Sequence, residues 1–289
     1  MRIAIVGLGL IGSSMAYQFK SVGSTVKGYA RNRSTVEKAL TFGIIDSGST
    51  NLEEVVCNVD VVVLAVPIEI IPIMIKEVEE VLDSETIVMD VGSVKKYIMD
   101  EANKMSLKKA LFVGAHPMAG SEKVGIDNFI KDLYVDKPFI VNYPNDNIKS
   151  KTEKKVKEFV RILRSNYIEM DEYTHDKMVA EISHIPYVLS SVLFNHVARG
   201  QARKVASTGY RDMTRIAHSD PLWGTVVSFF NRENICNGID EIIAALNFIK
   251  KSLTIADIDS IFDFLNIDNV DNTKKNLVKK QIYDYYDLK

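Results

Sequence analysis

Three glycines near the start of the chain have the spacing of a phosphate-binding turn. Gly7, Gly9 and Gly12 follow an apolar β-branched run and open a stretch with helical patterning. The first glycine permits a tight turn, the second lets the backbone approach a pyrophosphate, and the third allows the helix to pack closely on the strand. The β-α-β context predicts a dinucleotide site rather than an empty glycine turn. We assign to it the turn and two residues that end a later strand: Gly7, Leu8, Gly9, Leu10, Ile11, Gly12, Val66 and Pro67.

The end of the second predicted strand bears on which dinucleotide binds. An NAD site usually has Asp or Glu about 20 residues past the first glycine, where it binds the ribose 2′-hydroxyl. Ala30 holds that position here, and Arg31 and Arg33 follow it. Their guanidinium groups could bind a 2′-phosphate, although solvated surface arginines would give the same pattern. The sequence therefore favours NADP modestly over NAD.

Three later stretches carry side chains suited to proton transfer and anion binding. His116, with Ser121 and Glu122 after it, lies in a loop that follows a strand at the carboxyl edge of the sheet, where open α/β sheets bind ligands. A neutral imidazole can accept a hydroxyl proton near physiological pH, although such a His can also merely stabilise a turn. Ser93 begins a predicted helix, so N-capping is its alternative role. The guanidinium of Arg215 matches a carboxylate, and a solvated helix surface is its alternative.

Segment 172–199 predicts one long helix with two stripes. Pro186 should kink it or mark a local irregularity. The first stripe is apolar and should pack: Met178, Ile182, Ile185, Leu189 and Leu193. The second is mostly polar and could line a cleft, although a lone helix His such as His184 is more often a packing residue: Ala180, His184, Tyr187, Ser191 and Asn195.

Strand and helix patterns alternate through the first half of the chain. The predicted strands are Arg2–Val6, Thr25–Tyr29, Val61–Val66, Thr86–Asp90, Leu111–Val113, Pro138–Asn142 and Tyr167–Met170. The predicted helices between them are Gly12–Val22, Ser34–Leu40, Ile68–Leu82, Ser93–Lys104 and Ile148–Ser165. This alternation predicts an α/β fold, a Rossmann-type doubly wound parallel sheet over residues 1–171. Strand signals then stop, which predicts an all-helical domain over 172–289 for substrate binding and dimerisation, with the active site between the two domains.

Composition excludes several classes of protein. A formal charge of -2 over 289 residues suggests neither a nucleic-acid nor a membrane surface. Cys57 and Cys236 have no metal or redox spacing, so we expect no metal site and a reducing compartment. No signal peptide or spanning run is visible, and we expect a cytoplasmic protein.

Three further stretches, with the glycine turn, resemble the prephenate dehydrogenase family in order and spacing. They are DVGSVK at 90–95, GAHPMAGSE at 114–122 and GYRDMTRIA at 209–217. The resemblance covers nearly the whole chain, and the second and third stretches are specific to the family. The length leaves no room for the chorismate mutase or ACT domain that some members carry.

The resemblance implies oxidative decarboxylation of prephenate to 4-hydroxyphenylpyruvate in tyrosine biosynthesis, or of arogenate to tyrosine. Hydride would pass from C4 to the nicotinamide, His116 would take the hydroxyl proton with Ser93 beside it, and Arg215 would bind a carboxylate. Arg211 is a weaker candidate for that carboxylate. Trp223 stands where the family has an aromatic near the pocket, with core packing as its equal alternative. The remaining substrate contacts would be Ser121, Glu122, His184 and Tyr187.

Tyr187 stands where many members would have a second His, which leaves prephenate against arogenate open. A β-hydroxyacid dehydrogenase is a rival with the same plan, as is an imine reductase. The hydroxyacid enzymes rely on a Lys that the stretch EISHIPYVLSSVLFN lacks. A dinucleotide sensor without catalysis is the rival from another class, and it would need neither His116 nor Arg215.

Overall fold

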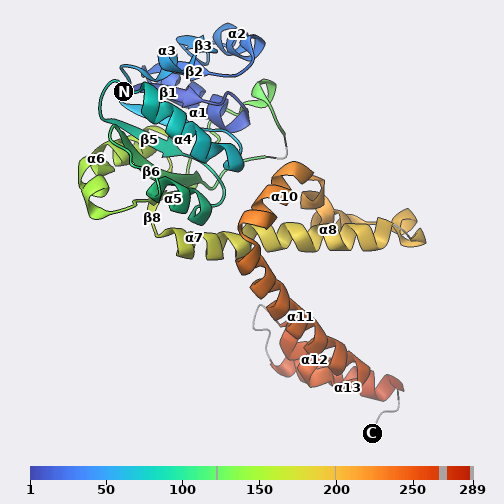
Figure 1. Cartoon of the computed structure of the whole chain (residues 1–289). Coiled ribbons are helices and arrows are strands. Elements are labelled where there is room, and N and C mark those ends of the chain that lie inside the picture. Colours follow the sequence, from blue (N-terminus) through green and yellow to red (C-terminus); the bar gives the residue numbers. More distant parts are fainter. Residues whose placement is uncertain (122, 199, 267–271, 287–289) are drawn as a thin grey trace. The chain divides into compact units, whose positions relative to one another are not determined.

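The structure is a computed structural model that describes residues 1–121, 123–198, 200–266 and 272–286 (Figure 1). The chain forms two compact units, Met1–Asn234 and Ile235–Lys289. The domain boundary predicted at residue 171 stays a prediction.

One sheet of eight strands forms the centre of the first unit, in the order β3-β2-β1-β4-β5-β6-β7-β8. The strands are β1 Arg2–Val6, β2 Thr25–Tyr29, β3 Ser47–Ser49, β4 Val61–Leu64, β5 Thr86–Asp90, β6 Ala110–Pro117, β7 Pro138–Asn142 and β8 Asn166–Glu169. Strands β1 to β6 are mutually parallel, which confirms the predicted fold class. The strand order reverses between β1 and β4, and ligands of open α/β sheets bind at such a point.

The far edge of the sheet departs from the all-parallel prediction. Strand β7 pairs antiparallel with β6, and β8 is parallel to β7. An antiparallel neighbour needs no crossover helix. Accordingly, the connection from β6 to β7 contains only a short 3-10 turn, Ile126–Asn128, among its described residues.

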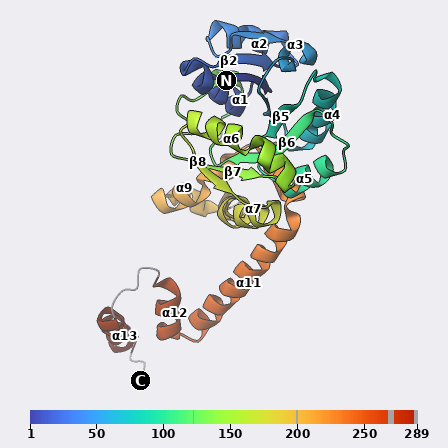
Figure 2. The same ribbon diagram turned by 90° about the vertical axis from the view of Figure 1, so that its left-hand side faces the viewer.

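Helices cover both faces of the sheet (Figure 2). Their bounds are α1 Leu10–Ser21, α2 Arg33–Thr41, α3 Leu52–Val56, α4 Ile71–Val81, α5 Lys96–Asn103 and α6 Asp146–Ile162. Ile3 and Ile5 of β1 join one apolar core with α1, α2 and α6, whereas Ala4 and Val6 join the other core with α3, α4 and α5. This alternation follows from the two-residue period of a strand.

The strand and helix predictions are confirmed within a few residues, with two omissions. β3 has the sequence SGS, which lacks the β-branched residues that mark strands, and α3 has five residues, too few to show helical periodicity. β6 is longer than predicted and continues through Pro117.

A nearly continuous helix follows the sheet (Figure 1). It consists of α7 Glu172–Val179, a π-helical turn Ala180–His184 and α8 Ile185–Ala198. Pro186 has no N–H, and its ring would clash with the carbonyl of Ile182 in a regular α-helix. The wider π-helical turn accommodates the ring, which confirms the predicted irregularity.

The polar stripe of this helix lines hollows, as predicted: His184 lines one, and Tyr187, Ser191 and Asn195 line another. The apolar stripe is only partly buried in the single chain, where Ile185 is 4% exposed. Met178, Ile182 and Leu189 of the apolar stripe are exposed, by 49%, 67% and 37%. His184 of the polar stripe is fully buried. After this helix come α9 Thr208–Thr214, a 3-10 turn Arg215–His218 and α10 Pro221–Phe230. Val227 of α10 lies in the same apolar core as residues of α4 and α5, so α10 packs with the elements on that face of the sheet.

The second unit is helical in its described part. It contains α11 from Ile235 onward (Arg232–Thr254 in full), α12 Ile258–Leu265 and α13 Asn272–Tyr286. Phe248 and Phe264 join α11 to α12, with ring centroids 6.0 Å apart. Lys275 of α13 pairs with Asp263 at 2.7 Å. In the described part of the chain, no helix is both long and apolar enough to cross a membrane.

Candidate active site

The three glycines of the turn after β1 have three different structural roles. Gly7 has φ 103°, and a Cβ there would lie 2.3 Å from the carbonyl oxygen of Ala65. A Cβ on Gly12 would lie 2.0 Å from the carbonyl oxygen of Gly7, so this glycine lets α1 pack against the turn. Gly9 caps α1, and a Cβ on it would meet nothing within 4 Å. The backbone is therefore open at Gly9, where the free N–H groups of α1 could receive a pyrophosphate.

A cavity of about 810 Å³ lies next to this turn, and all the residues that line it belong to the first unit. Its volume is in the range of small-molecule sites. Gly9, Leu10, Ile11, Val66 and Pro67 line one part of it. Other parts are lined by residues of the β5–α5 connection, β6, the loop after β6, the π-helical turn and α10: Ser93, His116, Ser121, Ile182, His184 and Trp223. The structure thus brings predicted cofactor and substrate residues to one cavity.

His116 is the first member of a chain of three polar side chains. Its Nδ1 lies 2.9 Å from Nε2 of His175, and Nδ1 of His175 lies 2.7 Å from Oδ1 of Asp176. His175 is fully buried and Asp176 nearly so. Asp176 also accepts the backbone N–H groups of Lys95 at 2.7 Å and Lys96 at 3.0 Å. The sequence analysis missed His175 and Asp176, because a His-Asp pair in a helix also occurs on ordinary surfaces.

A buried ion pair lies behind this chain. The ammonium of Lys95 contacts the carboxylate of Asp90, and both side chains are fully buried. Asp90 further accepts the N–H of Gly92 at 2.8 Å and that of Ala115 at 3.2 Å. Every oxygen of this carboxylate is therefore hydrogen-bonded, as a buried charge requires. Asp90 thus links the end of β5 to β6 and to the residue that precedes α5.

The histidines of the site have lowered basicity. Burial, with His175 and Lys95 nearby, holds the pKa of His116 well below its usual range. Burial also lowers the pKa of His175, although the hydrogen bond that His175 donates to Asp176 acts in the opposite direction. Burial lowers the pKa of His184 to about 4. All three imidazoles are therefore neutral near physiological pH, which is the form that can accept a proton.

His184 lines the cavity with one ring nitrogen that has no partner. Its Nδ1 lies 3.1 Å from Nδ2 of Asn231, whose amide also donates to the carbonyl of Asp176 at 2.7 Å. Since the Asn amide donates, Nδ1 of His184 accepts and its Nε2 carries the proton. This buried Nε2 has no hydrogen-bond partner among the described residues. His184 can therefore offer a neutral donor to a ligand.

Two predicted roles need correction. Ser93 does not cap a helix, because α5 begins at Lys96. The carboxylate of Asp176 instead accepts the backbone N–H groups of Lys95 and Lys96 at the start of α5. Instead the Ser93 hydroxyl lines the cavity and accepts from the indole N–H of Trp223 at 3.5 Å. His116 lies within β6, where it pairs with Ile140 of β7, rather than in a loop after the strand. A strand holds its imidazole more firmly than a loop would.

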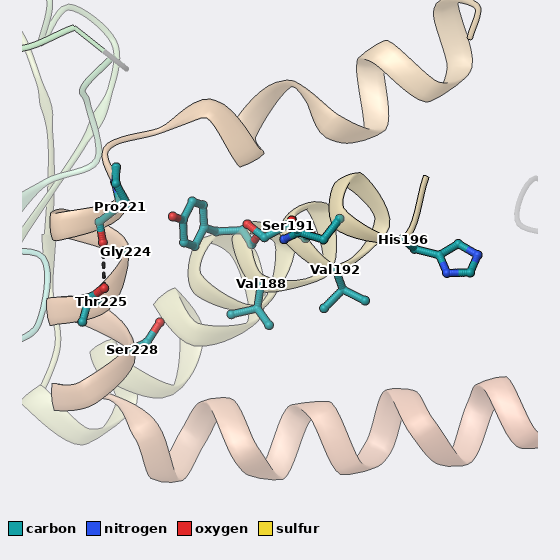
Figure 3. A pocket seen from close by; sticks show the side chains of 10 residues that line it. Val188, Ser191, Val192, His196, Pro221, Gly224, Thr225 and Ser228 are labelled. Carbon is teal, nitrogen blue, oxygen red and sulfur yellow. Dashed lines mark hydrogen bonds between the residues drawn. The ribbon is translucent and has the colours of Figure 1, made fainter. Parts of the chain in front are cut away.

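Tyr187 lines a different hollow from His116. A groove between α8 and α10 is lined by Tyr187, Val188, Ser191, Val192, Asn195, His196, Pro221, Gly224, Thr225 and Ser228 (Figure 3). Gly224 makes room for the Tyr187 ring, since a Cβ there would lie 2.3 Å from it. Trp223 contacts the rings of both Tyr187 and His184, at centroid distances of 5.7 and 6.1 Å. Tyr187 as a substrate contact stays a prediction.

The predicted arginines are all exposed, and none of them lines the cavity. Arg215 opens the 3-10 turn after α9, and Arg211 lies in α9. Ala30 is buried directly after β2. Arg33 pairs with Glu37 at 3.0 Å, whereas Arg31 has no ion pair among the described residues. Glu122 lies outside the described residues. The roles of these residues stay predictions.

Models of one protein family match both halves of the chain. The family model "Prephenate dehydrogenase, nucleotide-binding domain" matches residues 15–168, and "Prephenate dehydrogenase, dimerization domain" matches 171–267. Prephenate dehydrogenase of Lactococcus lactis subsp. cremoris is 30% identical, over 99% of this chain and 81% of its own length.

Two solved structures have the same fold over almost the full chain. Prephenate dehydrogenase from A. aeolicus, in complex with hydroxyphenyl propionate and NAD+, has a TM-score of 0.84 at 27% identity and covers 98% of each chain. Synechocystis arogenate dehydrogenase has a TM-score of 0.81 at 27% identity, over 95% of this chain and 99% of its own. With both halves matched by the models of one family, the chain belongs to the prephenate dehydrogenase family.

Proposed function

We propose that this protein oxidises and decarboxylates prephenate to 4-hydroxyphenylpyruvate, a step of tyrosine biosynthesis. The observation that carries the proposal is the neutral imidazole of His116 in the same cavity as the open turn at Gly9. This places a proton acceptor beside a site for a nicotinamide dinucleotide, which supplies the hydride acceptor when bound. A protein that only senses dinucleotides would have no need of a buried proton acceptor there.

The side chains of the cavity supply the proton transfers of the reaction. As the C4 hydride leaves, His116 accepts the 4-hydroxyl proton through its imidazole, and the hydroxyl of Ser93 orients the same oxygen. The bond from C1 to the ring carboxylate then breaks, its electron pair enters the ring, and CO₂ leaves. The proton held by His116 returns to the phenolate oxygen of the product, so the histidine ends neutral. The sum is prephenate and oxidised dinucleotide to 4-hydroxyphenylpyruvate, CO₂ and reduced dinucleotide.

The substrate's two carboxylates need donors. His184 offers its unpartnered Nε2–H within the cavity, and Ser121 also lines it. We further assign Arg215 to a carboxylate and Glu122 to the substrate, on their match to the family motifs. Tyr187, which stands where many members would have a second His, is a further proposed substrate contact. Arogenate is the alternative substrate, and it differs by an amino group in place of the keto group of the side chain.

Steady-state assays with prephenate and arogenate, each against NAD and NADP, test the proposed function. Turnover of prephenate with release of CO₂ is the expected result. Turnover of arogenate but not of prephenate would identify arogenate as the substrate. Binding of dinucleotide without turnover of either compound would contradict an enzymatic function.

The dinucleotide preference rests on the end of β2. We propose that NADP is favoured, because Ala30 offers no carboxylate to a ribose 2′-hydroxyl while Arg31 is exposed and unpaired among the described residues. The wild type should have a lower KM for NADP than for NAD, and Ala30→Asp with Arg31→Ile should reverse that order. Arg164→Ala, at an exposed arginine that pairs with Asp132, is the matched comparison and should leave both KM values unchanged. A strong preference of the wild type for NAD would contradict the proposal.

We propose that the helical residues after Asp171 form a homodimer, as the name of the matched dimerization model suggests. Val192 of α8 and Phe229 of α10 are 61% and 60% exposed in the single chain. Apolar faces of this kind are commonly buried against a partner. Light scattering at micromolar concentration should give twice the chain mass of 32.5 kDa.

A pair of variants tests where the dimer forms. Phe229→Glu should shift the protein toward monomer, because it places a charge on the proposed interface. Val22→Glu, at a comparably exposed position after α1, should leave the dimer intact. A wild-type mass of 32.5 kDa at that concentration would refute the homodimer.

We place the protein in the cytoplasm. Cys57 and Cys236 are both free thiols, which suits a reducing compartment.

A further inference from the structure

The chain of side chains behind His116 has a direction that can be derived from its hydrogen bonds. Asp176 accepts at both oxygens, because backbone N–H groups of Lys95 and Lys96 point at them. Nδ1 of His175 lies 2.7 Å from the same carboxylate, so this nitrogen must carry a proton. A neutral His175 therefore has only a lone pair on Nε2.

The next bond in the chain is determined by this lone pair. Nδ1 of His116 lies 2.9 Å from Nε2 of His175, and two bare nitrogens cannot bond. Nδ1 of His116 must then carry the proton. In a neutral His116 the other nitrogen, Nε2, is left with a free lone pair, and it has no protein partner among the described residues. Only this tautomer can take a proton through the nitrogen that remains available to a ligand.

We propose that His175 and Asp176 are positioning residues that hold His116 in the Nδ1–H tautomer, leaving its Nε2 free to accept the substrate proton. The inference rests on the proposed function for the identity of that proton. The tautomer itself can be observed without any substrate. The logic resembles that of an Asp that orients a catalytic His directly, but here a second imidazole lies between the two.

Asp176 is well placed to anchor the chain. Its backbone carbonyl accepts from Asn231 at 2.7 Å, and its side chain accepts at the start of α5. The carboxylate is therefore immobilised by elements 81 and 55 residues away in sequence. When His116 is transiently protonated, Nδ1–H is already bonded to His175, so the new charge is stabilised without reorganisation.

The first experiment reads the tautomer directly. Long-range ¹H–¹⁵N correlation spectra of the ¹⁵N-histidine-labelled protein, without ligand at neutral pH, distinguish a protonated from a bare ring nitrogen. His116 should show a protonated Nδ1 and a bare Nε2, the form that free histidine disfavours. Loss of its signals in His116→Gln assigns them. The exposed His196 and His218 serve as internal references for solvated imidazoles.

The second experiment compares two replacements of His175 of similar size. His175→Gln retains an acceptor oxygen for Nδ1–H of His116, whereas His175→Leu has none. Leu should lower kcat by about 10- to 100-fold with KM for the substrate nearly unchanged, a range typical of lost orienting partners. Gln should restore most of that loss. A purely structural role of His175 would give no such difference between the two.

The third variant removes the negative charge at the end of the chain. In Asp176→Asn the amide oxygen can still accept from Nδ1 of His175 and from the N–H of Lys95, which share one carboxylate oxygen, while the NH₂ group faces the N–H of Lys96. His116 should therefore keep its Nδ1–H tautomer in the spectrum, and kcat should fall less than in His175→Leu. Dinucleotide binding and thermal unfolding verify that the variant is folded, which matters because Asp176 also caps α5.

The outcomes separate the two proposals. A wild-type His116 protonated at Nε2 would overturn the positioning role, whatever the enzyme turns over. Equal kcat values for His175→Gln and His175→Leu would overturn it as well. A wild type with the expected tautomer but no turnover of prephenate or arogenate would instead count against the proposed function alone.

Discussion

Replacing His116 with Asn should lower kcat by about 10²- to 10⁴-fold, the usual effect of removing a positioned acid–base group. The side chain lines the cavity next to the dinucleotide turn, and its pKa is held well below the usual range, so it is present as the neutral acceptor. Asn approximates the shape of the imidazole near the backbone but cannot take a proton. Stopped assays of prephenate consumption at saturating substrate and dinucleotide measure kcat directly.

Dinucleotide affinity separates this effect from a general disturbance of the site. The turn at Gly7, Gly9 and Gly12 lies on β1 and α1, whereas His116 lies on β6, so binding of NADP should be nearly unchanged. A variant that keeps near-normal kcat would remove His116 from the mechanism. His196→Asn is the matched control, because that histidine is exposed near the end of α8 and does not line the cavity.

Replacing Arg215 with Ala should raise KM for prephenate by about one to two decades with little change in kcat. A guanidinium that grips a carboxylate equally in ground and transition states contributes to binding alone. A hydrogen bond to a charged group is worth about 1.5–3 kcal/mol, and about 1.4 kcal/mol corresponds to one decade. Arg215 is exposed in the structure, so its contact with a carboxylate lacks the added strength of a buried ion pair. We therefore expect KM to rise by no more than about two decades.

Three further measurements define what Arg215 does. Arg215→Lys should recover only part of the loss, because an ammonium cannot reproduce the two-point fork. Arg203→Ala, another exposed arginine in the same helical segment, should leave KM unchanged. Normal KM for prephenate combined with weakened dinucleotide binding would assign Arg215 to the cofactor instead.

Much of the fold could be predicted from the sequence, since its signals are local. The alternating apolar residues of β1 and the spacing of Gly7, Gly9 and Gly12 determine backbone conformation over a few residues. Pro186 predicted the irregular turn, because a proline has no N–H to donate to the carbonyl four residues earlier and its ring clashes with that carbonyl. The α/β class and the position of the dinucleotide turn followed from these patterns.

The arrangement of the site depended on tertiary structure. His116 and His175 are 59 residues apart, and Asp176 lies 81 residues from the backbone N–H of Lys95 that it accepts. Nothing in the sequence near Ser93 indicates that Asp176 of α7 caps the start of α5. The N-capping role that Ser93 would have by its position alone is therefore not observed. Strand direction at β7 and the exposed face of α8 were also decided by packing. Backbone geometry is governed by neighbours in sequence, whereas a polar contact requires several separately folded elements to place two side chains within 3 Å.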